Sequence, residues 1–377
     1  MFLKLAQSLS DTIKTPFSLK LPDGKEIKFG EQYGPPLFQV DVKTQKALRA
    51  IKSGDELKIA ESYIYGDIDL NGAVDMLKFL EIKNLFAKNR PIVITWLHFI
   101  AFFTKQVTIN RESIAQHYEF DSEFFLMFLD QTRSYSQALF ATDDEPHADA
   151  AQRKLQYAFD SCHLVPGANV LDIGAGWGNV VEFLGTRGVN VDAVTIANKS
   201  EQFITKLIND KKLSQCQIFK IDFLDYQPPA GKHYDAITSL GTLEHLPNYK
   251  LVLQRCAALL RKGGYAYFDS SAKIAGFNDS YFIERHIFPG NHELLDIYRF
   301  LEAVKSSGFE LIAVHNDTHN YYLTLKHWAE NLDQHKEEII KRWGLTHYRK
   351  FQLYLWGCTH NMLNNELQAY RVVLRKL

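Results

Sequence analysis

The stretch Leu171-Asp-Ile-Gly-Ala-Gly-Trp-Gly178 decides the fold. A short apolar strand runs into three glycines at alternate positions, and a helix-forming segment, Asn179–Arg187, follows. Glycine lets the backbone turn tightly and approach a ligand closely, and the start of the next helix offers free N–H groups. The spacing differs from the G-x-G-x-x-G of dinucleotide-binding proteins, and no Walker lysine follows, which excludes a P-loop. The stretch therefore predicts a ligand-binding turn between a strand and a helix.

Strand-like and helix-like segments alternate on the carboxyl side of this turn. Apolar runs typical of strands recur at 191–196, 217–221, 234–240, 265–270, 310–315 and 367–374. Helical patterns lie between them, for example at 249–262 and 294–307. This alternation is typical of an α/β fold with a mostly parallel sheet covered by helices on both faces. We predict a seven-stranded Rossmann-like sheet, with a helical insertion at 325–365 before the last strand.

The amino-terminal part is predicted to be a small α+β domain. Phe17-Ser-Leu-Lys-Leu alternates as a strand does, Pro22–Lys25 is a turn, and Glu26-Ile-Lys-Phe alternates again, which predicts a hairpin. Helical patterns follow at 43–52 and 56–65, and the second is broken by the Gly66–Gly72 stretch. We place the domain boundaries at 1–85 for this domain, 86–112 for a linker with an apolar helix, and 113–377 for the α/β domain.

Composition excludes several classes of function. Lys plus Arg number 43 and Asp plus Glu 44, so the net charge is -1 and bulk electrostatics does not hold the chain to nucleic acid. The 4 cysteines lie far apart and form no C-x-x-C pair, which favours a reducing cytoplasm over a zinc ribbon or a disulfide framework. His315 and His319 have a helical metal-site spacing, but no third ligand is evident, so no metal is predicted.

The most apolar stretch is Pro91–Thr104, PIVITWLHFIAFFT. It has 14 residues and includes His98, whereas a bilayer-spanning helix needs about 20 apolar residues. A buried helix is the simpler interpretation, and a face that touches lipid is the alternative. Residues 1–112 carry 16 basic and 13 acidic side chains against 27 and 31 in the remainder. This imbalance permits weak attraction of the first part to an anionic membrane surface.

Further residues favour S-adenosylmethionine as the ligand of the glycine turn. Asp172 stands just before the turn, and a carboxylate there suits a ligand that carries an ammonium and a sulfonium. Thr195 occupies the strand end where many nucleotide sites place a ribose-binding carboxylate, so Gln202 on the following helix is the better candidate for the ribose. Asp222 is placed to accept a hydrogen bond from the adenine amine while Phe223 lies on the ring.

Nearly the whole chain resembles the cyclopropane-fatty-acid synthase family of S-adenosylmethionine-dependent methyltransferases. The specific part is the block before the glycine turn, His117-Tyr-Glu-Phe-Asp-Ser-Glu-Phe-Phe-Leu-Met-Phe-Leu-Asp130 followed by Tyr135-Ser136, which general methyltransferases lack. The resemblance also covers Leu21-Pro-Asp-Gly24, Ile59–Asp67, Glu244-His245, Ile287-Phe-Pro-Gly290, the Tyr321 region and the final strand.

The resemblance implies a role for each matching residue. The methionine end of the cofactor is held by Tyr135, Ser136, Gly174 and Gly176. The ribose side is contacted by Thr195, Ile196 and Gln202, and the adenine side by Asp222 and Phe223. The acyl chain lies in an apolar tunnel near His117 and Tyr118.

The reaction that the resemblance implies is methyl transfer to a carbon–carbon double bond in a membrane phospholipid. A carbocation forms, and a base removes a proton to close a cyclopropane ring, or to leave a methyl or methylene branch. The implied protein is cytoplasmic and peripheral to the membrane, and family members often form homodimers. Two alternatives stay open: a C- or N-methyltransferase of a soluble small molecule on the same scaffold, and a catalytically inactive lipid-binding module.

The sequence departs from the family pattern at the base. In the synthases a bicarbonate is held by a Cys, a Glu, a His and a Tyr; Glu244 and Tyr321 match, whereas Gln137 replaces the Cys and Asp269 the His. A neighbouring carboxylate disfavours an anion, because like charges repel strongly in a dry site. We predict that Asp269 and Glu244 form an acid/base pair in place of bicarbonate. The alternative interpretation of Gln137 and His117 is a structural one, in which each side chain only forms hydrogen bonds.

Overall fold

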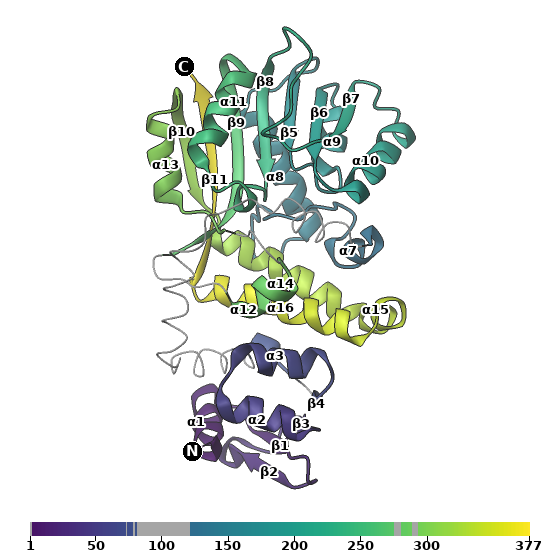
Figure 1. Ribbon diagram of the computed structural model, residues 1–377, viewed down its shortest axis with the longest axis vertical. Coiled ribbons are helices and arrows are strands. Elements are labelled where there is room, and N and C mark those ends of the chain that lie inside the picture. Colours follow the sequence, from purple (N-terminus) through teal and green to yellow (C-terminus); the bar gives the residue numbers. More distant parts are fainter. Residues whose placement is uncertain (1, 73, 78–79, 81–120, 275–279, 289–292) are drawn as a thin grey trace. The chain divides into compact units, whose positions relative to one another are not determined.

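Figure 1 shows the computed structural model, which describes residues 2–72, 74–77, 80, 121–274, 280–288 and 293–377. The chain divides into two compact units. The first comprises Met1–Thr108, Asp279–Ile287 and Leu332–His360, and the second Ile109–Asn278, Phe288–Asn331 and Asn361–Leu377. The predicted linker and apolar helix at 86–112, and His117, lie outside the described residues. None of the helices that the structure describes is long and apolar enough to cross a membrane.

The first unit contains a sheet of strands in the order β2-β1-β3-β4. Its strands are β1 (Phe17–Lys20), β2 (Glu26–Phe29), β3 (Phe38–Val42) and β4 (Ile68–Gly72), and its first helices are α1 (Phe2–Ile13), α2 (Gln45–Ser53) and α3 (Glu56–Ile64). β1 and β2 pair antiparallel through a tight turn in which the Leu21 N–H donates to the Lys25 carbonyl at 2.8 Å, which confirms the predicted hairpin.

One strand of this unit lies where the sequence predicted only a helix break. β4 pairs antiparallel with β3, and Ile68 lies opposite Val42 with both side chains buried. Polar residues at Asp69 and Asn71 alternate with the apolar ones, and they are depleted in strands, so they hide the strand signal. Pairing with β3 overrides this weak local propensity.

Helices from the carboxyl-terminal part of the chain belong to the first unit. It includes α12 (Tyr281–His286), α15 (Lys336–Trp343) and most of α16 (Leu345–Leu363). Arg349 on α16 is buried; it donates to the carbonyls of Tyr63 and Ile68 at 2.8 and 3.1 Å and pairs with Asp69. The guanidinium of Arg349 thus satisfies one backbone carbonyl in α3, one at the start of β4, and the carboxylate of Asp69 on β4.

The second unit contains the predicted seven-stranded sheet (Figure 1). In the order β10-β11-β9-β8-β5-β6-β7, its strands are β10 (Phe309–Asn316), β11 (Leu367–Lys376), β9 (Leu260–Lys273), β8 (Tyr234–Leu240), β5 (Asn169–Ile173), β6 (Asn190–Thr195) and β7 (Cys216–Lys220). The β6, β5, β8 and β9 pairings are parallel, and β11 runs antiparallel to both of its neighbours. The α/β fold with a mostly parallel sheet is therefore confirmed.

Helices cover both faces of this sheet. α8 (His147–Ser161), α9 (Asn179–Gly185) and α10 (Asn198–Asp210) share one apolar core with it, and α11 (Tyr249–Leu259) and α13 (Ile297–Lys305) share the other. α11 ends three residues earlier than predicted, because Leu260 already pairs with Tyr234 as part of β9. The helical insertion starts earlier than predicted, at the first residue of α14 (Thr318–Gln334).

The strand order places a ligand site at one point of the sheet. β5 has β6 on one side and β8 on the other, so the direction of chain progression reverses at this strand. In open α/β sheets, ligands bind outside the carboxyl ends of the strands at such a reversal. The glycine turn lies at the carboxyl end of β5, so topology and sequence motif indicate the same place.

Candidate active site

The turn after β5 has a backbone that glycine adopts most readily. Gly174, Gly176 and Gly178 have φ values of +75°, +52° and +76°. The N–H of Gly174 donates to the Val194 carbonyl at 3.0 Å, which holds the turn against β6. A Cβ on Gly174 would lie 2.3 Å from Oγ1 of Thr242, whereas the nearest atom to one on Gly176 would be 3.9 Å away. Gly174 is thus tightly packed, and Gly176 borders open space.

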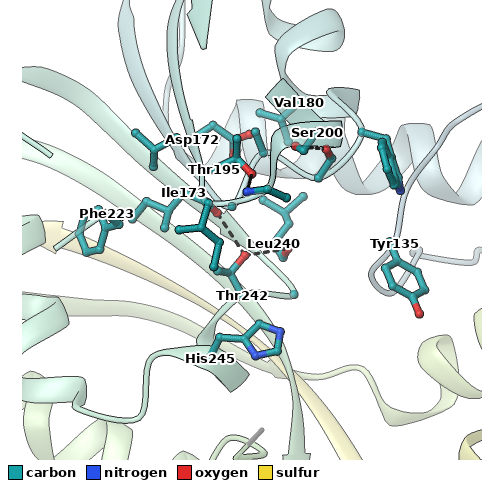
Figure 2. Close-up of a pocket in the computed structure, with 18 of the residues that line it drawn as sticks. Tyr135, Asp172, Ile173, Val180, Thr195, Ser200, Phe223, Leu240, Thr242 and His245 are labelled. Carbon is teal, nitrogen blue, oxygen red and sulfur yellow. Dashed lines mark hydrogen bonds between the residues drawn. The ribbon is translucent and has the colours of Figure 1, made fainter. Parts of the chain in front are cut away.

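A pocket lies over this turn at the carboxyl ends of β5, β6 and β8 (Figure 2). It is lined by every predicted cofactor residue except Gln202, namely Tyr135, Ser136, Asp172, Gly174, Gly176, Thr195, Ile196, Asp222 and Phe223. Gln202 is exposed on α10 and does not line it. Additional lining residues for which the sequence predicted no cofactor role are Arg133, Asn179, Ser200, Thr242 and His245.

The two ends of the pocket differ in chemistry. Phe223, 4% exposed, presents an aromatic ring at one side, and Tyr135 lies at the opposite side in Figure 2. The bare backbone of Gly176 and the carboxylate of Asp172 also line the pocket. This lining fits a nucleoside with a cationic tail: a flat base beside Phe223, and charged groups near the turn. The residues present therefore fit S-adenosylmethionine.

Asp172 carries a buried carboxyl group whose pKa depends on the neighbouring groups. Its Oδ1 accepts a hydrogen bond from Oγ1 of Thr238 at 2.7 Å. Burial raises the pKa of Asp172 to about 7, against the lowering effects of Thr238 and the more distant Lys154. A cationic ligand in the pocket would favour the ionised carboxylate and lower this pKa again.

The segment that carries Tyr135 is held by aromatic packing. The Tyr135 ring lies 5.6 Å from that of Phe125 and 6.1 Å from that of Phe128, both on α7 (Ser122–Leu129). It also packs 5.3 Å from the ring of Trp328 on α14. Aromatic packing of this kind fixes the orientation of a side chain. The next residue, Ser136, lines the pocket and accepts a hydrogen bond from Lys154 at 2.5 Å.

Glu244 is held by one carboxylate oxygen. Its Oε1 accepts from the N–H and the hydroxyl of Ser271 at 2.7 and 2.6 Å. Its Oε2 is buried and has no hydrogen-bond partner among the described residues. Burial raises the pKa of Glu244, and the bonds from Ser271 oppose the rise. The geometry leaves one oriented oxygen able to receive a proton.

Asp269 on β9 has one oxygen held by a hydrogen bond and the other facing a buried cation. Oδ1 accepts from the Gly241 N–H at 2.9 Å, and Oδ2 lies 3.7 Å from Nζ of Lys154. Burial raises the pKa of Asp269 to about 6; Lys154 lowers it, and the neighbouring Glu244 raises it further. Two adjacent carboxyls with raised pKa values are a typical acid/base arrangement.

Lys154 is a buried residue beside the carboxylate pair that sequence reasoning missed. It is 0% exposed on α8, and its Nζ also donates to Oγ of Ser134 at 3.2 Å. Burial lowers the pKa of Lys154, and Asp269 opposes this effect. A signal was present: Ala151, Leu155 and Ala158 form the buried stripe of α8, and position 154 falls on the same face. A charged residue within an apolar helical stripe needs a buried partner.

The remaining predicted catalytic residues have the following places. Gln137 is buried; its Nε2 donates to the Tyr370 carbonyl at 3.4 Å, and its Oε1 has no partner within the part of the chain that the structure describes. Tyr321 on α14 packs edge-on against Trp328 with ring centroids 6.2 Å apart. The roles predicted for Gln137, Tyr321 and His117 stay predictions.

Comparison with known proteins identifies the family of this chain. The sequence of residues 105–372 matches the mycolic acid cyclopropane synthetase family, and residues 4–89 match a domain of unknown function. The chain belongs to the mycolic acid cyclopropane synthetase family. The recognised family and the α/β fold are thereby confirmed, and the family supports an enzyme with S-adenosylmethionine as cofactor.

Two relatives indicate the chemistry found in this family. A probable fatty acid methyltransferase of Mycobacterium tuberculosis is 27% identical over 72% of this chain and 64% of its own length. A sphingolipid C9-methyltransferase of Candida albicans is 26% identical over 84% of this chain and 65% of its own length. The chain thus spans just under two thirds of each of these relatives.

Solved structures share the fold of most of the chain. The cyclopropane synthase MmaA2 from Mycobacterium tuberculosis matches with a TM-score of 0.66 and 25% identity, covering 72% of this chain and 100% of that chain. The mycolic acid cyclopropane synthase CmaA1, complexed with SAH and CTAB, matches with a TM-score of 0.66 and 24% identity, covering 71% of this chain and 98% of that chain.

A first prediction concerns the glycine that borders the pocket. In Gly176→Val, a β-branched side chain would take a strained positive φ and fill space beside the turn. We expect at least a 100-fold loss of S-adenosylmethionine affinity by calorimetry. Gly231→Val is the matched control, because Gly231 also has a positive φ, +79°, with nothing within 4 Å. Equal loss in both variants would contradict the role of Gly176 in the pocket.

A second prediction concerns the buried lysine. Lys154→Met leaves Asp269 without its cation, and breaking a buried pair on one side costs about 3–5 kcal/mol. Urea unfolding at pH 7.5 should show this loss, and Lys154→Met with Asp269→Asn should regain part of it. Lys206→Met, at an exposed pair with Asp210, should change stability by under about 0.5 kcal/mol. A double variant as unstable as Lys154→Met would show that the two residues are not coupled.

Proposed function

We propose that this protein transfers a methyl group from S-adenosylmethionine to the double bond of an unsaturated fatty acyl chain in a phospholipid. The observation that carries the proposal is the pocket over the glycine turn. Its lining includes most of the predicted cofactor residues and also Gly241, whose N–H donates to the buried carboxylate of Asp269. Membership of the mycolic acid cyclopropane synthetase family supports it, as do relatives named for action on fatty acids and sphingolipids. Peripheral membrane contact belongs to the proposal, and homodimer formation stays a prediction.

The chain's own residues would position the reactants and receive a proton. S-adenosylmethionine, when bound, supplies an electrophilic methyl group. Addition of a methyl cation to an alkene leaves the acceptor with a proton to lose, whether the product is a ring or a branch. Glu244 Oε2 and Asp269 Oδ2 are buried oxygens available for that proton, in a site from which water is largely excluded. Their burial keeps ionised carboxylates poorly solvated, which makes them stronger bases.

We further propose that these two carboxylates replace a bound bicarbonate. Gly241 faces Asp269, and Ser271 faces Glu244, so each side chain is oriented by backbone of a neighbouring strand or loop. The positive charge of Lys154 is already matched by Asp269 at 3.7 Å. A further anion at this place would meet two carboxyl groups and one cation, an unfavourable balance in a medium of low dielectric constant.

The third prediction tests the function directly. Purified protein is incubated with S-adenosylmethionine and vesicles of an unsaturated phospholipid, and the acyl chains are analysed by mass spectrometry. We expect chains heavier by one CH₂. Glu244→Gln should slow their formation at least 100-fold, the range of a general base, while donor affinity changes less than threefold. Glu302→Gln, exposed on α13, is the control and should retain full activity.

Other outcomes of this assay distinguish the alternatives. Donor binding with no change in the mass of any lipid, together with turnover of a soluble acceptor, would favour a methyltransferase of small molecules. Donor binding with neither reaction would favour an inactive lipid-binding module. Either outcome would contradict the proposed substrate.

The fourth prediction concerns bicarbonate. In buffer freed of carbon dioxide the wild-type rate should stay within about twofold of the rate with 10 mM bicarbonate added, because the base is part of the protein. Asp269→His is the informative comparison, since it removes one of the two buried carboxylates and should make the remaining activity respond to bicarbonate. Strong stimulation of the wild-type protein by bicarbonate would refute the replacement.

A further inference from the structure

A row of charged and polar side chains crosses three neighbouring strands beside the carboxylate pair. Asp269 on β9 lies directly opposite Arg371 on β11, and Arg371 lies directly opposite His315 on β10. Directly opposite residues of antiparallel strands point to the same face of a sheet. Here α8 covers that face, because Tyr157 of α8 contacts both His315 and Arg371. The row therefore places a guanidinium next to the carboxylate that we assign to proton transfer.

A second buried carboxyl, that of Asp317, pairs with this guanidinium. Oδ2 of Asp317 lies 3.4 Å from Nε of Arg371, whereas Oδ2 of Asp269 lies 3.7 Å from Nζ of Lys154. Asp317 is 2% exposed and Asp269 is 1% exposed, so solvent screens neither charge. Each of the two buried carboxyls thus has a cation of its own.

Asp317 is fixed in place by its backbone and by one of its oxygens. It follows the last residue of β10, and its N–H donates to the Ala369 carbonyl at 2.8 Å. Its Oδ1 accepts from Nδ2 of Asn320 at 3.3 Å. Its Oδ2 is buried and forms no hydrogen bond with the residues that the structure describes. This oxygen is therefore oriented toward Arg371 as a charge partner.

Arg371 is held by stacking and by charge more than by directional bonds. Its Cζ lies 4.2 Å from the centroid of the Tyr157 ring, whose hydroxyl lies 3.0 Å from Nε2 of His315. Its Nε and Nη1 are buried and form no hydrogen bond within the described ranges. A guanidinium bound in this way can change partner when the charge beside it changes, and oppositely charged side chains in directly opposite positions attract each other. Asp269 is the directly opposite carboxylate.

The two ion pairs are close enough to influence each other. Burial raises the pKa of Asp317 to about 6; Arg371 lowers it, and Asp269 raises it again. Removal of one charge therefore changes the proton affinity of the remaining carboxyl. The charged and titratable groups around Asp317 come from four elements, namely Lys154 and Tyr157 on α8, Tyr267 and Asp269 on β9, His315 on β10 and Arg371 on β11.

We propose that Asp317 is a positioning residue for the proton transfer, because it holds Arg371 away from Asp269 and so keeps Asp269 able to accept a proton. Without the charge of Asp317, the guanidinium turns to the directly opposite carboxylate. Asp269 would then face two cations, Arg371 and Lys154, and a carboxylate stabilised by two cations is a weaker base. The inference rests on the proposed function, in which Asp269 belongs to the pair that receives the proton.

The fifth prediction removes the carboxylate of Asp317. In Asp317→Asn, kcat with phospholipid vesicles should fall at least about tenfold while KM changes less than about twofold. The acidic limb of the profile of kcat against pH should move to lower pH, because Arg371 then lowers the pKa of Asp269. Arg371→Gln alone should move the same limb to higher pH, since it removes a positive charge. The double variant, which lacks both charges, should recover most of the rate.

A matched control lies on the same two strands. Glu310 on β10 pairs with Arg375 on β11 at 2.5 Å, and both side chains are exposed. Glu310→Gln should therefore leave the rate and the pH profile unchanged. A merely structural role of Asp317 would lower the rate in the double variant as well and would not move the limb in opposite directions in the two single variants. That result would overturn the proposal, and it is obtainable from Arg371→Gln and the double variant if Asp317→Asn folds poorly.

Crystal structures of the wild-type chain and of Asp317→Asn test the positioning without turnover. We expect the guanidinium of Arg371 to move to within about 3.2 Å of the Asp269 carboxylate in the variant. A guanidinium that stays on the Tyr157 ring in the variant would overturn the proposal. This readout separates the two failures, because a wild-type chain that methylates no lipid contradicts the proposed function, whereas the place of Arg371 decides the role of Asp317.

Discussion

The backbone at the end of β5 is the constraint on which the site depends. Gly174 approaches Thr242 so closely that a Cβ would lie 2.3 Å from its hydroxyl, and this contact joins the β5 turn to the loop after β8. That loop carries Gly241, which donates to Asp269, and then Glu244. The loop after β8 thus borders the pocket and also positions the carboxylate pair. Steric exclusion at a single glycine couples their positions.

Buried charge is the second constraint, and a residue outside the pocket motifs offsets part of it. Asp172, Asp269 and Glu244 are all buried, and each has a raised pKa because an ionised carboxyl is poorly solvated there. Lys154 supplies a buried positive charge from α8, and it orients Ser136 through a 2.5 Å hydrogen bond. One side chain therefore links Ser136 in the pocket lining to Asp269 in the buried carboxylate pair. Replacing both partners of such a pair by apolar residues is often neutral, whereas removing one partner alone is costly.

Much of the fold was accessible from the sequence, because its signals are local. Glycine spacing, apolar runs and turn residues predicted the β5 turn, the alternating strands and helices, and the amino-terminal hairpin, and the structure confirms these features. Most of the predicted cofactor residues line one pocket for the same reason: they follow the carboxyl ends of parallel strands, which meet at one edge of a sheet. Gln202 shows the limit of such predictions. The position of a residue around the helix axis decides which way its side chain points, and Gln202 on α10 points into solvent.

The sequence by itself determined where the chain turns in the α/β domain, most of the cofactor residues that line the glycine pocket, and which family the protein belongs to. Only the tertiary structure decided which distant side chains meet. Lys154 reaches Asp269 from another element, Arg349 reaches Asp69 from near the other end of the chain, and two histidines 180 residues apart share the carboxylate of Asp130. No periodicity records such pairs, because they arise where separately formed elements pack together, and burial then makes each charge require a partner.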